Sequence, residues 1–544
     1  MQRSPDASLD WLAALRKHAK VDLLSGFLVF LIALPLSLGI ALASGFPAIA
    51  GVVTAVIGGL LVTFLSGAPL TIKGPAAGLI AIAVSAVAEL GEGDAVLGYR
   101  RTLAVIVVAG IVQIGLGLVR AGRLGDFFPG SAVHGMLAAI GVIIVAKQIH
   151  VMLGVVPGAR EPLGLLAEVP HSLVHMNPEI ALIGLVSLVI LFGLPMIPHP
   201  IAKKIPAPLV VLVVAMPLGL AFDLDHAHTY SMIGETFDIG PSFLVAVPSN
   251  LASAIVLPDF SQVLTGTSLK LVAMFALVGT LESLLTVRAI DGLDPNHGRS
   301  RYDLDIVAIG AGNTLSGLLG GLPMISEIVR SKANLDAGAK SRFANWYHGA
   351  FLLFFVAFLP MLVHEIPLAA LGAMLVYTGT RLASPRELVH AWRLGRDQAA
   401  VFLSTLFVTL MTDLLVGVGV GIVLEIVLHV IHGARPRTLF RPVVDESDED
   451  GARVLRVRST ATFASYLAVK ERIYARAREH TRVVIDLASS PLVDHTTQER
   501  LRDLAVELRD LGMSLEIRGL EGHRVLGQLP TALRKRARVA VAAE

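Results

Sequence analysis

Glu282 is a carboxylate in the middle of a long apolar stretch, within the sequence Gly-Thr-Leu-Glu-Ser-Leu-Leu-Thr at 279–286. Thr286 follows four residues later, so in a helix its hydroxyl lies on the same face as the carboxylate. If the stretch crosses a membrane, an ionisable group there is costly to bury and is a candidate functional residue. A carboxylate beside a hydroxyl fits part of a Na⁺ coordination shell, and a buried carboxylate can also carry a proton. The alternative is a structural hydrogen bond to a neighbouring helix.

Glu327 and Arg330 are a second charged group inside apolar sequence, three residues apart. At this spacing the two side chains can pair with each other and only hold their helix in place. In the other interpretation, Arg330 contributes positive charge to a bound anion and Glu327 helps to bind a coupling cation. Asp413 and Glu425, farther along the chain, are weaker candidates of the same kind.

The apolar stretches that hold these residues predict a membrane domain. Of the 544 residues, 54% are hydrophobic and 16% are charged, whereas soluble domains carry about 25% charged residues. From residue 435 onward about one residue in three is charged, against about one in eight before it. A soluble enzyme of this length is therefore excluded, and a net charge of +2 gives no support for nucleic-acid binding. The absence of cysteine excludes disulfides and thiolate metal sites.

Fourteen segments are candidate spans, since a spanning helix needs about 20 apolar residues, or fewer where it is broken or shielded by protein. The segments are 21–43, 46–66, 74–90, 102–119, 131–155, 180–195, 205–222, 269–288, 304–320, 324–336, 348–363, 367–380, 398–412 and 414–432. Basic residues gather in the loops after even-numbered segments, whereas 223–269 is acidic and holds no lysine or arginine. Because cationic loops stay in the cytoplasm, we expect both termini there.

Two of these segments begin with a Gly/Pro interruption at corresponding places. The third opens with Gly74–Gly78 and the tenth follows Gly320–Pro323, and each is the third segment of a half of seven. Paired interruptions indicate inverted repeats with a binding site near the membrane midplane. A helix that begins inside the membrane has unpaired amides at the positive end of its dipole, so two such ends that face each other form an anion site. The alternative is that Pro75 and Pro323 only kink continuous helices.

The charged C-terminal part alternates between strands and helices. We expect strands at 454–458, 482–487 and 514–518 and helices at 463–478 and 496–511, with Leu501, Leu504, Leu508 and Leu511 on one buried face of the last helix. This alternation predicts a small α/β domain. The acidic run Asp445–Asp450 is interpreted as a solvated hinge. The chain is thus divided into a cytoplasmic segment 1–20, a membrane domain 21–432 with repeats at about 21–222 and 269–432, a linker 433–452 and a domain 453–544.

Several motifs resemble the SulP family, bacterial relatives of the sulfate and anion exchangers, whose chains end in a STAS domain. The motifs are Gly74-Pro75, Glu282–Thr286, Gly312–Pro323, Val484–Leu487 and Leu492–Thr496, and the resemblance covers nearly the whole chain. It implies an all-α polytopic membrane domain of about 14 spans, as a seven-plus-seven inverted repeat with core and gate subdomains, and a small cytoplasmic α/β STAS domain. It also implies a homodimer in the inner membrane of a bacterium, no enzymatic activity, no cofactor, and a cytoplasmic regulator that contacts the STAS domain.

The same resemblance implies where the substrate binds, between the third and tenth half-helices. The substrate-binding residues would be Gly74, Pro75, Ala76, Ala77, Gly78, Ile325, Ser326, Glu327, Ile328 and Arg330, and Glu282 and Thr286 match the sodium-binding pair of bicarbonate-importing members. The chain departs from the family at Ala76, where a small hydroxyl residue is common, and at Glu327, which places an acid beside the anion. The sequence Asp494-His495-Thr496 also lacks the glycine of the phosphorylatable STAS loop.

The sequence therefore predicts secondary active transport of a small inorganic oxyanion, with bicarbonate as the first candidate, by alternating access. Glu282, Thr286 and Glu327 are the expected ion-coupling residues, with Na⁺ or H⁺ as the coupling ion. Four alternatives remain open: a symporter or exchanger of sulfate or a dicarboxylate, an uncoupled anion channel, a membrane sensor whose output is the STAS domain, and a nucleobase carrier on the same fold, against which the STAS domain argues by analogy.

Overall fold

The computed structural model describes residues 11–159, 161–199, 205–232, 235–246, 254–294, 300–449, 451–477 and 479–536. The ends of the predicted N-terminal segment and STAS domain, 1–10 and 537–544, lie outside the described residues. The chain divides into two compact units. The first runs up to Gly122 and includes Ile140–Leu382, and the second consists of Arg123–Ala139 and the residues from Ala383 onward. The predicted linker, 433–452, lies within the second unit.

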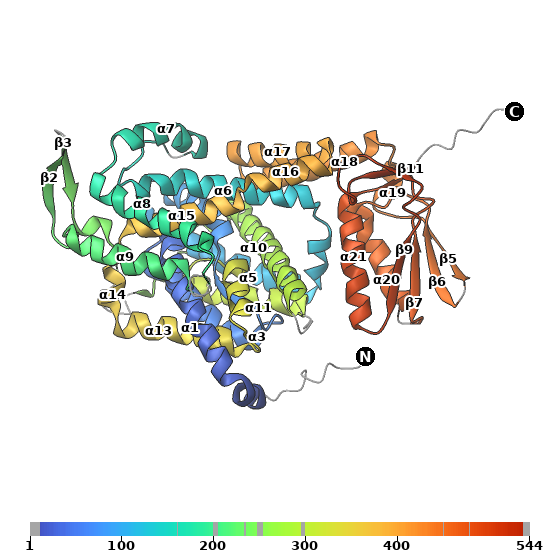
Figure 1. Ribbon diagram of the computed structural model, residues 1–544, viewed down its shortest axis with the longest axis horizontal. Coiled ribbons are helices and arrows are strands. Elements are labelled where there is room, and N and C mark those ends of the chain that lie inside the picture. The colour runs from blue at the N-terminus through green and yellow to red at the C-terminus, as the bar shows by residue number, and fades with distance from the viewer. Residues whose placement is uncertain are drawn as a thin grey trace. The chain divides into compact units, whose positions relative to one another are not determined.

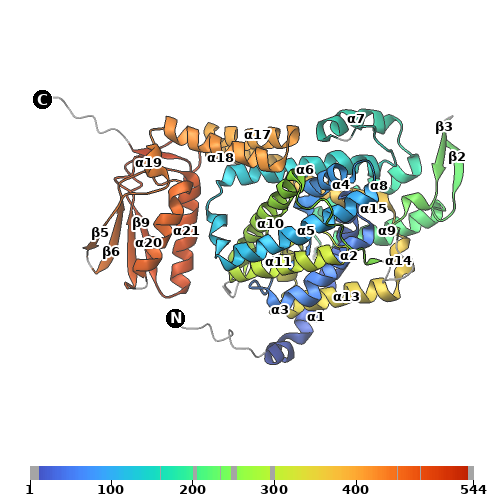
Figure 2. The same cartoon turned by 180° about the vertical axis from the view of Figure 1, so that it is seen from behind.

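Helices make up most of both units (Figures 1 and 2). They are α1 Trp11–Ala43, α2 Ala48–Ile57, α3 Thr63–Leu65, α4 Ile80–Gly91, α5 Ala95–Leu118, α6 Gly130–Met152, α7 Pro162–Val174, α8 Pro178–Gly193, α9 Ala207–Ala221, α10 Gly266–Leu293, α11 Tyr302–Leu318, α12 Ile328–Asp336, α13 Phe343–Phe358, α14 Pro360–His364, α15 Leu368–Leu382, α16 Pro385–Leu394, α17 Arg396–Met411, α18 Leu414–Ile431, α19 Pro436–Leu439, α20 Phe463–Ala477 and α21 His495–Asp510. Each of the fourteen predicted spans coincides with a helix or with a short strand followed by a helix, which confirms the all-α polytopic fold.

Seven helical segments of the described chain are long and apolar enough to cross a bilayer. They are Leu15–Ala43, Ala48–Leu65, Ala95–Leu118, Gly130–Met152, Pro178–Met196, Gly266–Leu293 and Leu414–Ile431. Shorter apolar helices occupy Ala77–Gly91, Ala207–Ala221 and Phe343–Phe358. A short helix can lie at membrane depth only where protein satisfies the backbone groups at its ends, so the local partners of the interrupted segments decide whether they are viable.

The interior of the first unit is built on close helix crossings. α5 packs along α11, and at their contact Gly110 faces Gly310. A Cβ at either position would come within 2.6 Å of the other glycine's carbonyl oxygen. Small residues of this kind let two backbones approach closely in membrane proteins, where packing rather than the hydrophobic effect joins helices. This contact fixes α11, which carries one side of the site described below.

Within the second unit, the C-terminal part is the predicted α/β domain. Its main sheet has the order β5-β6-β7-β9, from Val444–Glu449, Ala452–Val457, Arg482–Asp486 and Ser514–Arg518, and a smaller sheet joins β8 Leu492–Val493, β10 His523–Val525 and β11 Arg534–Arg536. β6, β7 and β9 run parallel, β5 is antiparallel to β6, and α20 and α21 lie together on one side of the main sheet (Figures 1 and 2).

The hinge interpretation of the acidic run is wrong. Residues 444–449 form the edge strand β5, and Asp450 lies outside the described residues. Opposite charges across the strands explain the ordering: Arg453 donates to Glu446 and to Asp448 at 2.8 Å each. The hydrogen bond from Arg453 lowers the pKa of Glu446. Such cross-strand pairs stabilise a sheet edge that a run of unpaired acids would disfavour.

The predicted helix face is confirmed at three of its four leucines. Leu501, Leu504 and Leu508 are buried. Leu511 is 53% exposed because α21 ends at Asp510 and the chain turns away there.

A candidate anion site between two interrupted helices

The two Gly/Pro interruptions meet in the first unit. β1, Ile72–Pro75, pairs antiparallel with β4, Met324–Glu327, in the register Pro75↔Met324 and Ile72↔Glu327. The amide of Ala76 also donates to the carbonyl of Pro323 at 3.1 Å. A short helix follows each strand, so the prediction that Pro75 and Pro323 come together at two half-helices is confirmed, and the alternative of two kinked continuous helices is wrong.

Side chains from neighbouring helices satisfy the backbone of the second interruption. Asn313 of α11 makes two hydrogen bonds with Met324, donating to its carbonyl and accepting from its amide. One turn later, Ser316 donates to the carbonyl of Leu322 at 2.8 Å, and Thr54 of α2 accepts from the Leu322 amide at 2.6 Å. These polar residues, of which Asn313 and Ser316 belong to the Gly312–Pro323 motif, therefore replace the hydrogen bonds that a continuous helix would make.

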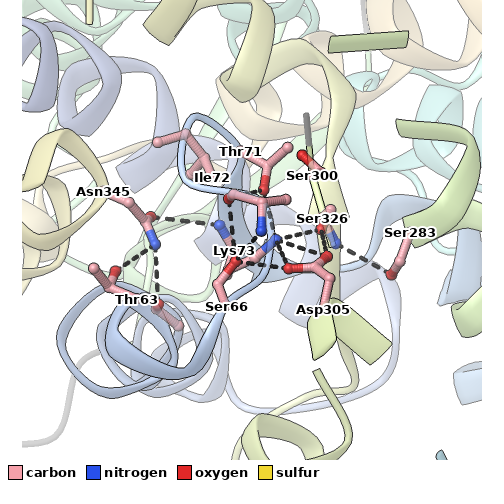
Figure 3. Close-up of polar contacts among 12 residues, drawn as sticks. Thr63, Ser66, Thr71, Ile72, Lys73, Ser283, Ser300, Asp305, Ser326 and Asn345 are labelled. Atoms are coloured by element: carbon pink, nitrogen blue, oxygen red, sulfur yellow. Dashed lines mark hydrogen bonds and ion pairs between the residues drawn. The ribbon is translucent and has the colours of Figure 1, made fainter. Parts of the chain in front are cut away.

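One face of the strand pair carries a buried ion pair (Figure 3). The Lys73 ammonium lies 2.8 Å from a carboxylate oxygen of Asp305 on α11, and neither side chain is more than 2% exposed. Lys73 also donates to the Ser326 hydroxyl at 2.7 Å, and Ser66 donates to Asp305 at 2.6 Å. Because Lys73 and Ser326 are direct cross-strand partners, their side chains lie on the same face of the ribbon.

This ion pair was not predicted from the sequence, although the position of each partner is unusual. Lys73 directly precedes the Gly-Pro interruption, and Asp305 lies near the start of an apolar segment. A single sequence does not say that they pair. The side chain of Ser326, which was expected at the substrate, is used on this face instead.

Arg330 belongs to α12, which follows β4, and is one of the largest fully buried side chains of the described chain. Within that part of the chain, none of its three guanidinium nitrogens has a hydrogen-bond partner. Its Nη1 lies 2.5 Å from where a Cβ of Gly74 would stand, so a side chain at position 74 would require the guanidinium to shift. A buried charge without partners is costly, and a bound anion would satisfy the guanidinium.

Glu327 does not form the hydrogen-bonded pair with Arg330 that the spacing allowed. Its carboxylate instead accepts a hydrogen bond from the amide of Ala77 at 3.3 Å. Ala77 is the first residue of the short 3₁₀ turn that leads into α4, so an acid of the tenth segment takes one of the amides at the start of the third. The two half-helices are thereby linked through a carboxylate at the position predicted for an anion.

Glu282 lies on α10 and is 6% exposed. Its Oε1 has no hydrogen-bond partner in the described chain. The carboxylate lies against Gly78 so closely that a Cβ on Gly78 would overlap it. The structural hydrogen bond offered as the alternative for Glu282 is therefore absent at this oxygen among the described residues, and the carboxylate faces the start of the third segment.

Some of the remaining predicted residues are buried at the candidate site, and others are exposed or have a structural role. Ala76 and Ile325 are buried next to the strand crossing, and Thr286 is buried on the same helix as Glu282, whereas Ile328 is 37% exposed. Asp413 caps α18 by accepting from the amide of Val416 at 2.9 Å, a structural role.

Glu425 and His348 are two further buried polar side chains. Glu425 belongs to the second unit. His348 on α13, which the sequence analysis did not single out, is fully buried with both ring nitrogens unpartnered among the described residues.

Comparison with known proteins identifies the family. Residues 20–405 match the model of the sulfate permease family. The chain belongs to this family. It is 26% identical over 526 residues to YbaR of Bacillus subtilis, which carries the name of a sulfate transporter, with 96% of this chain and 98% of the relative covered. It is 25% identical over 528 residues to the bicarbonate transporter BicA of Synechocystis, with 93% and 89% covered.

A solved structure shares the fold over both parts of the chain. That of SLC26A9 matches with a TM-score of 0.68 at 17% identity, over 94% of this chain and 86% of that one. The match includes the C-terminal α/β part, which agrees with a STAS domain. The protein is thus a multi-pass membrane transporter of anions and not an enzyme.

Proposed function

We propose that the protein is a secondary active transporter of a small inorganic oxyanion, with bicarbonate as the first candidate, and that it works by alternating access coupled to Na⁺ or H⁺. The observation that carries this proposal is the buried guanidinium of Arg330, without hydrogen-bond partners in the described chain and directly beside Gly74. A planar guanidinium matches the oxygens of a trigonal oxyanion in a way that a point charge does not.

The amides at the two half-helix starts complete the proposed anion site. Backbone N–H groups at the positive end of a helix dipole favour an anion, and the amide of Ala77 already donates to a carboxylate oxygen of Glu327. We infer that the substrate binds beside this carboxylate or displaces it. In either case Glu327 couples the position of the tenth segment to the presence of substrate.

The two buried acids support cation coupling rather than a simple anion channel. Glu282 has an unpartnered oxygen, and Thr286 lies on the same helical face four residues on. Glu282 lies against Gly78, and Glu327 accepts from the amide of Ala77. A cation or proton that neutralises either acid therefore changes the field at the start of the third segment. In this proposal Na⁺ is a transported ion, held by Glu282 and Thr286.

The acids also support a monovalent substrate. A carboxylate at the half-helix start repels a divalent anion more strongly than a monovalent one, which favours bicarbonate over sulfate. The relatives carry both names, since YbaR is named for sulfate and BicA for bicarbonate. Sulfate and a dicarboxylate are therefore the competing substrates that an assay must include.

The setting in the cell is part of the proposal. We infer a bacterial inner membrane with both termini in the cytoplasm, because the loops after even-numbered spans carry the basic residues. We also infer a homodimer and a cytoplasmic regulator of the STAS domain, on the family resemblance.

Uptake into proteoliposomes tests the proposal. Labelled bicarbonate uptake is measured with and without a Na⁺ gradient and a pH gradient, in competition with unlabelled bicarbonate, sulfate and fumarate. We expect uptake that depends on one of the two gradients and is reduced most by bicarbonate. The variant Glu282→Gln should lose this gradient dependence.

Glu89→Gln is the matched control, because Glu89 is an exposed acid at the far end of α4. It should behave as the unsubstituted protein does. Cation dependence that persists unchanged in Glu282→Gln contradicts the coupling role, and uptake indifferent to both gradients in the unsubstituted protein favours a channel or an uncoupled exchanger.

A further inference from the structure

Glu425, His429 and Asp494 come together inside the second unit. Glu425 and His429 are one helical turn apart on α18, and Asp494 is the N-cap residue of α21 in the α/β domain. The side chains of Glu425, His429 and Asp494 are 2%, 3% and 0% exposed. A helix long and apolar enough to cross a membrane and the α/β domain thus contribute two acids and a histidine to one buried cluster.

The distances within the cluster are too long for hydrogen bonds and suited to shared metal coordination. The Nε2 of His429 lies 3.6 Å from Oε1 of Glu425 and 3.7 Å from Oδ2 of Asp494. One ligand atom from each residue lies within 4.8 Å of the other two. Ligands bound to Zn²⁺ at about 2.1 Å in a tetrahedron are about 3.4 Å apart, so little movement is needed to enclose an ion.

Several polar atoms of the cluster lack partners among the described residues, although Oε1 of Glu425 and Oδ2 of Asp494, the oxygens nearest to His429, each accept one hydrogen bond. In the described part of the chain, the two ring nitrogens of His429 have no hydrogen-bond partner. The Oε2 atom of Glu425 has none there either. No lysine or arginine among the described residues forms an ion pair with Glu425 or Asp494. Two buried carboxylates without a cation are costly, and a divalent ion would neutralise both.

Hydrogen bonds from neighbouring groups already orient the two acids. Gln398 donates to Oε1 of Glu425 at 2.8 Å, and Ser131 in turn donates to Gln398 at 2.5 Å. Asp494 accepts from the amides of Phe463 at 2.6 Å and Thr497 at 2.7 Å. Hydrogen bonds of this kind to ligating carboxylates are typical of metal sites.

We propose that Glu425, His429 and Asp494 bind a divalent transition metal, with Zn²⁺ as the fitting ion, and that this metal fastens α18 to the start of α21. A histidine nitrogen with two carboxylate oxygens favours Zn²⁺ over Mg²⁺ and Ca²⁺, which prefer all-oxygen shells. The fourth position is left for water. The site is separate from the proposed anion site, which lies in the first unit.

A second histidine cluster in the same unit is the main competitor for added zinc. His134 lies 2.9 Å from Glu387, and His495 lies 3.2 Å from Glu499, around a pocket that His390 also lines. Each of these two histidines already has a carboxylate partner, and His134 is half exposed. Zinc that binds adventitiously in this pocket would use His390, so His390→Ala is the control for such binding.

Metal analysis of the full-length protein in detergent tests the proposal. The protein is treated with a chelator, dialysed against low free Zn²⁺ and analysed by mass spectrometry for bound metal. We expect about one equivalent per chain, a dissociation constant raised at least about tenfold in His429→Ala and in the isosteric Glu425→Gln, and no change in His390→Ala or in His432→Ala at the end of α18. Zn²⁺ should also raise the unfolding temperature of the unsubstituted protein and not that of His429→Ala.

Co²⁺ provides a readout that needs no substitution, since tetrahedral Co²⁺ absorbs strongly in the visible range. An unsubstituted protein that retains neither Zn²⁺ nor Co²⁺ overturns the proposal. It is equally overturned if His390→Ala loses the metal while folded His429→Ala and Glu425→Gln keep it.

Discussion

Gly78 lies against the carboxylate of Glu282, at a contact where no side chain would fit between them. Gly78 belongs to the start of the third segment and Glu282 to α10, so the contact joins the proposed anion site to the proposed cation site. An ion that binds to or leaves Glu282 therefore acts directly on the backbone that would hold the anion.

We predict that Gly78→Ala weakens cation coupling. The added methyl group overlaps the carboxylate of Glu282, and overpacking of this kind costs about 1–3 kcal/mol. If that cost falls on the cation-bound state, cation affinity falls by roughly 5- to 150-fold. The measurement is the cation concentration for half-maximal uptake, and Gly115→Ala, at a site with open space around the Cβ position, is the control. An unchanged cation dependence in Gly78→Ala would show that the contact does not matter for coupling.

Arg330→Lys should not be a conservative change. Lysine keeps the positive charge but loses the planar pair of donors that match an oxyanion. We expect the KM for the anion to rise by about tenfold or more, corresponding to at least about 1.4 kcal/mol of binding free energy. Arg342→Lys is the control, since Arg342 donates to backbone carbonyls of Thr63 and Phe64 and lies outside the proposed site. Equal KM values for the two variants would show that Arg330 does not contact the substrate.

The Lys73–Asp305 ion pair can be tested by a double-mutant cycle. Lys73→Met removes the ammonium group and leaves the buried Asp305 carboxylate without its opposite charge. This should lower the free energy of unfolding by about 3–5 kcal/mol. The double variant Lys73→Met with Asp305→Asn removes the leftover charge, so it should be more stable than Lys73→Met alone. Thermal unfolding of the detergent-solubilised protein measures the cycle. Effects that simply add would mean that the two charges do not interact.

Much of this fold could be predicted from the sequence because hydrophobicity sets the spans and Gly/Pro interruptions set the breaks. The meeting of Pro75 with Pro323 followed from the repeat, and the strands and helices of the α/β domain followed from periodicity. Interactions between distant residues could not be predicted. Nothing in the spacing says that Lys73 pairs with Asp305, and the i,i+3 spacing of Glu327 and Arg330 suggested a pair that the structure does not form.

The acidic run before the α/β domain shows the same limit in a different form. Five acids in succession, interrupted by one serine, favour a solvated linker when only local charge is considered. The structure places 444–449 in β5 because arginines that follow along the chain neutralise them: Arg453 contacts Glu446 and Asp448, and Arg518 contacts Glu449 at 2.9 Å. Local composition predicted a linker where the structure has a strand, because the compensating arginines belong to other strands.

The paired acid Glu446 gives a pH-dependent prediction. The hydrogen bond from Arg453 lowers its pKa in the folded protein, so the carboxylate contributes stability at pH values above the unfolded pKa of about 4.3. That contribution is lost as the pH falls through the lower folded pKa. Glu446→Gln should therefore lower the unfolding temperature at neutral pH, and the difference should shrink and vanish in acid.

The size of this effect should be small, because partly exposed ion pairs contribute about 1 kcal/mol or less, and 1 kcal/mol corresponds to roughly 2–4 °C in a unit of this size. Thermal unfolding of the full-length protein and of Glu446→Gln, measured from neutral pH to below pH 4, provides the comparison. Glu521→Gln, an exposed acid of the same domain, controls for the loss of a negative charge. A Glu446→Gln difference that stays constant across this range would mean that the carboxylate does not stabilise β5 through its charge.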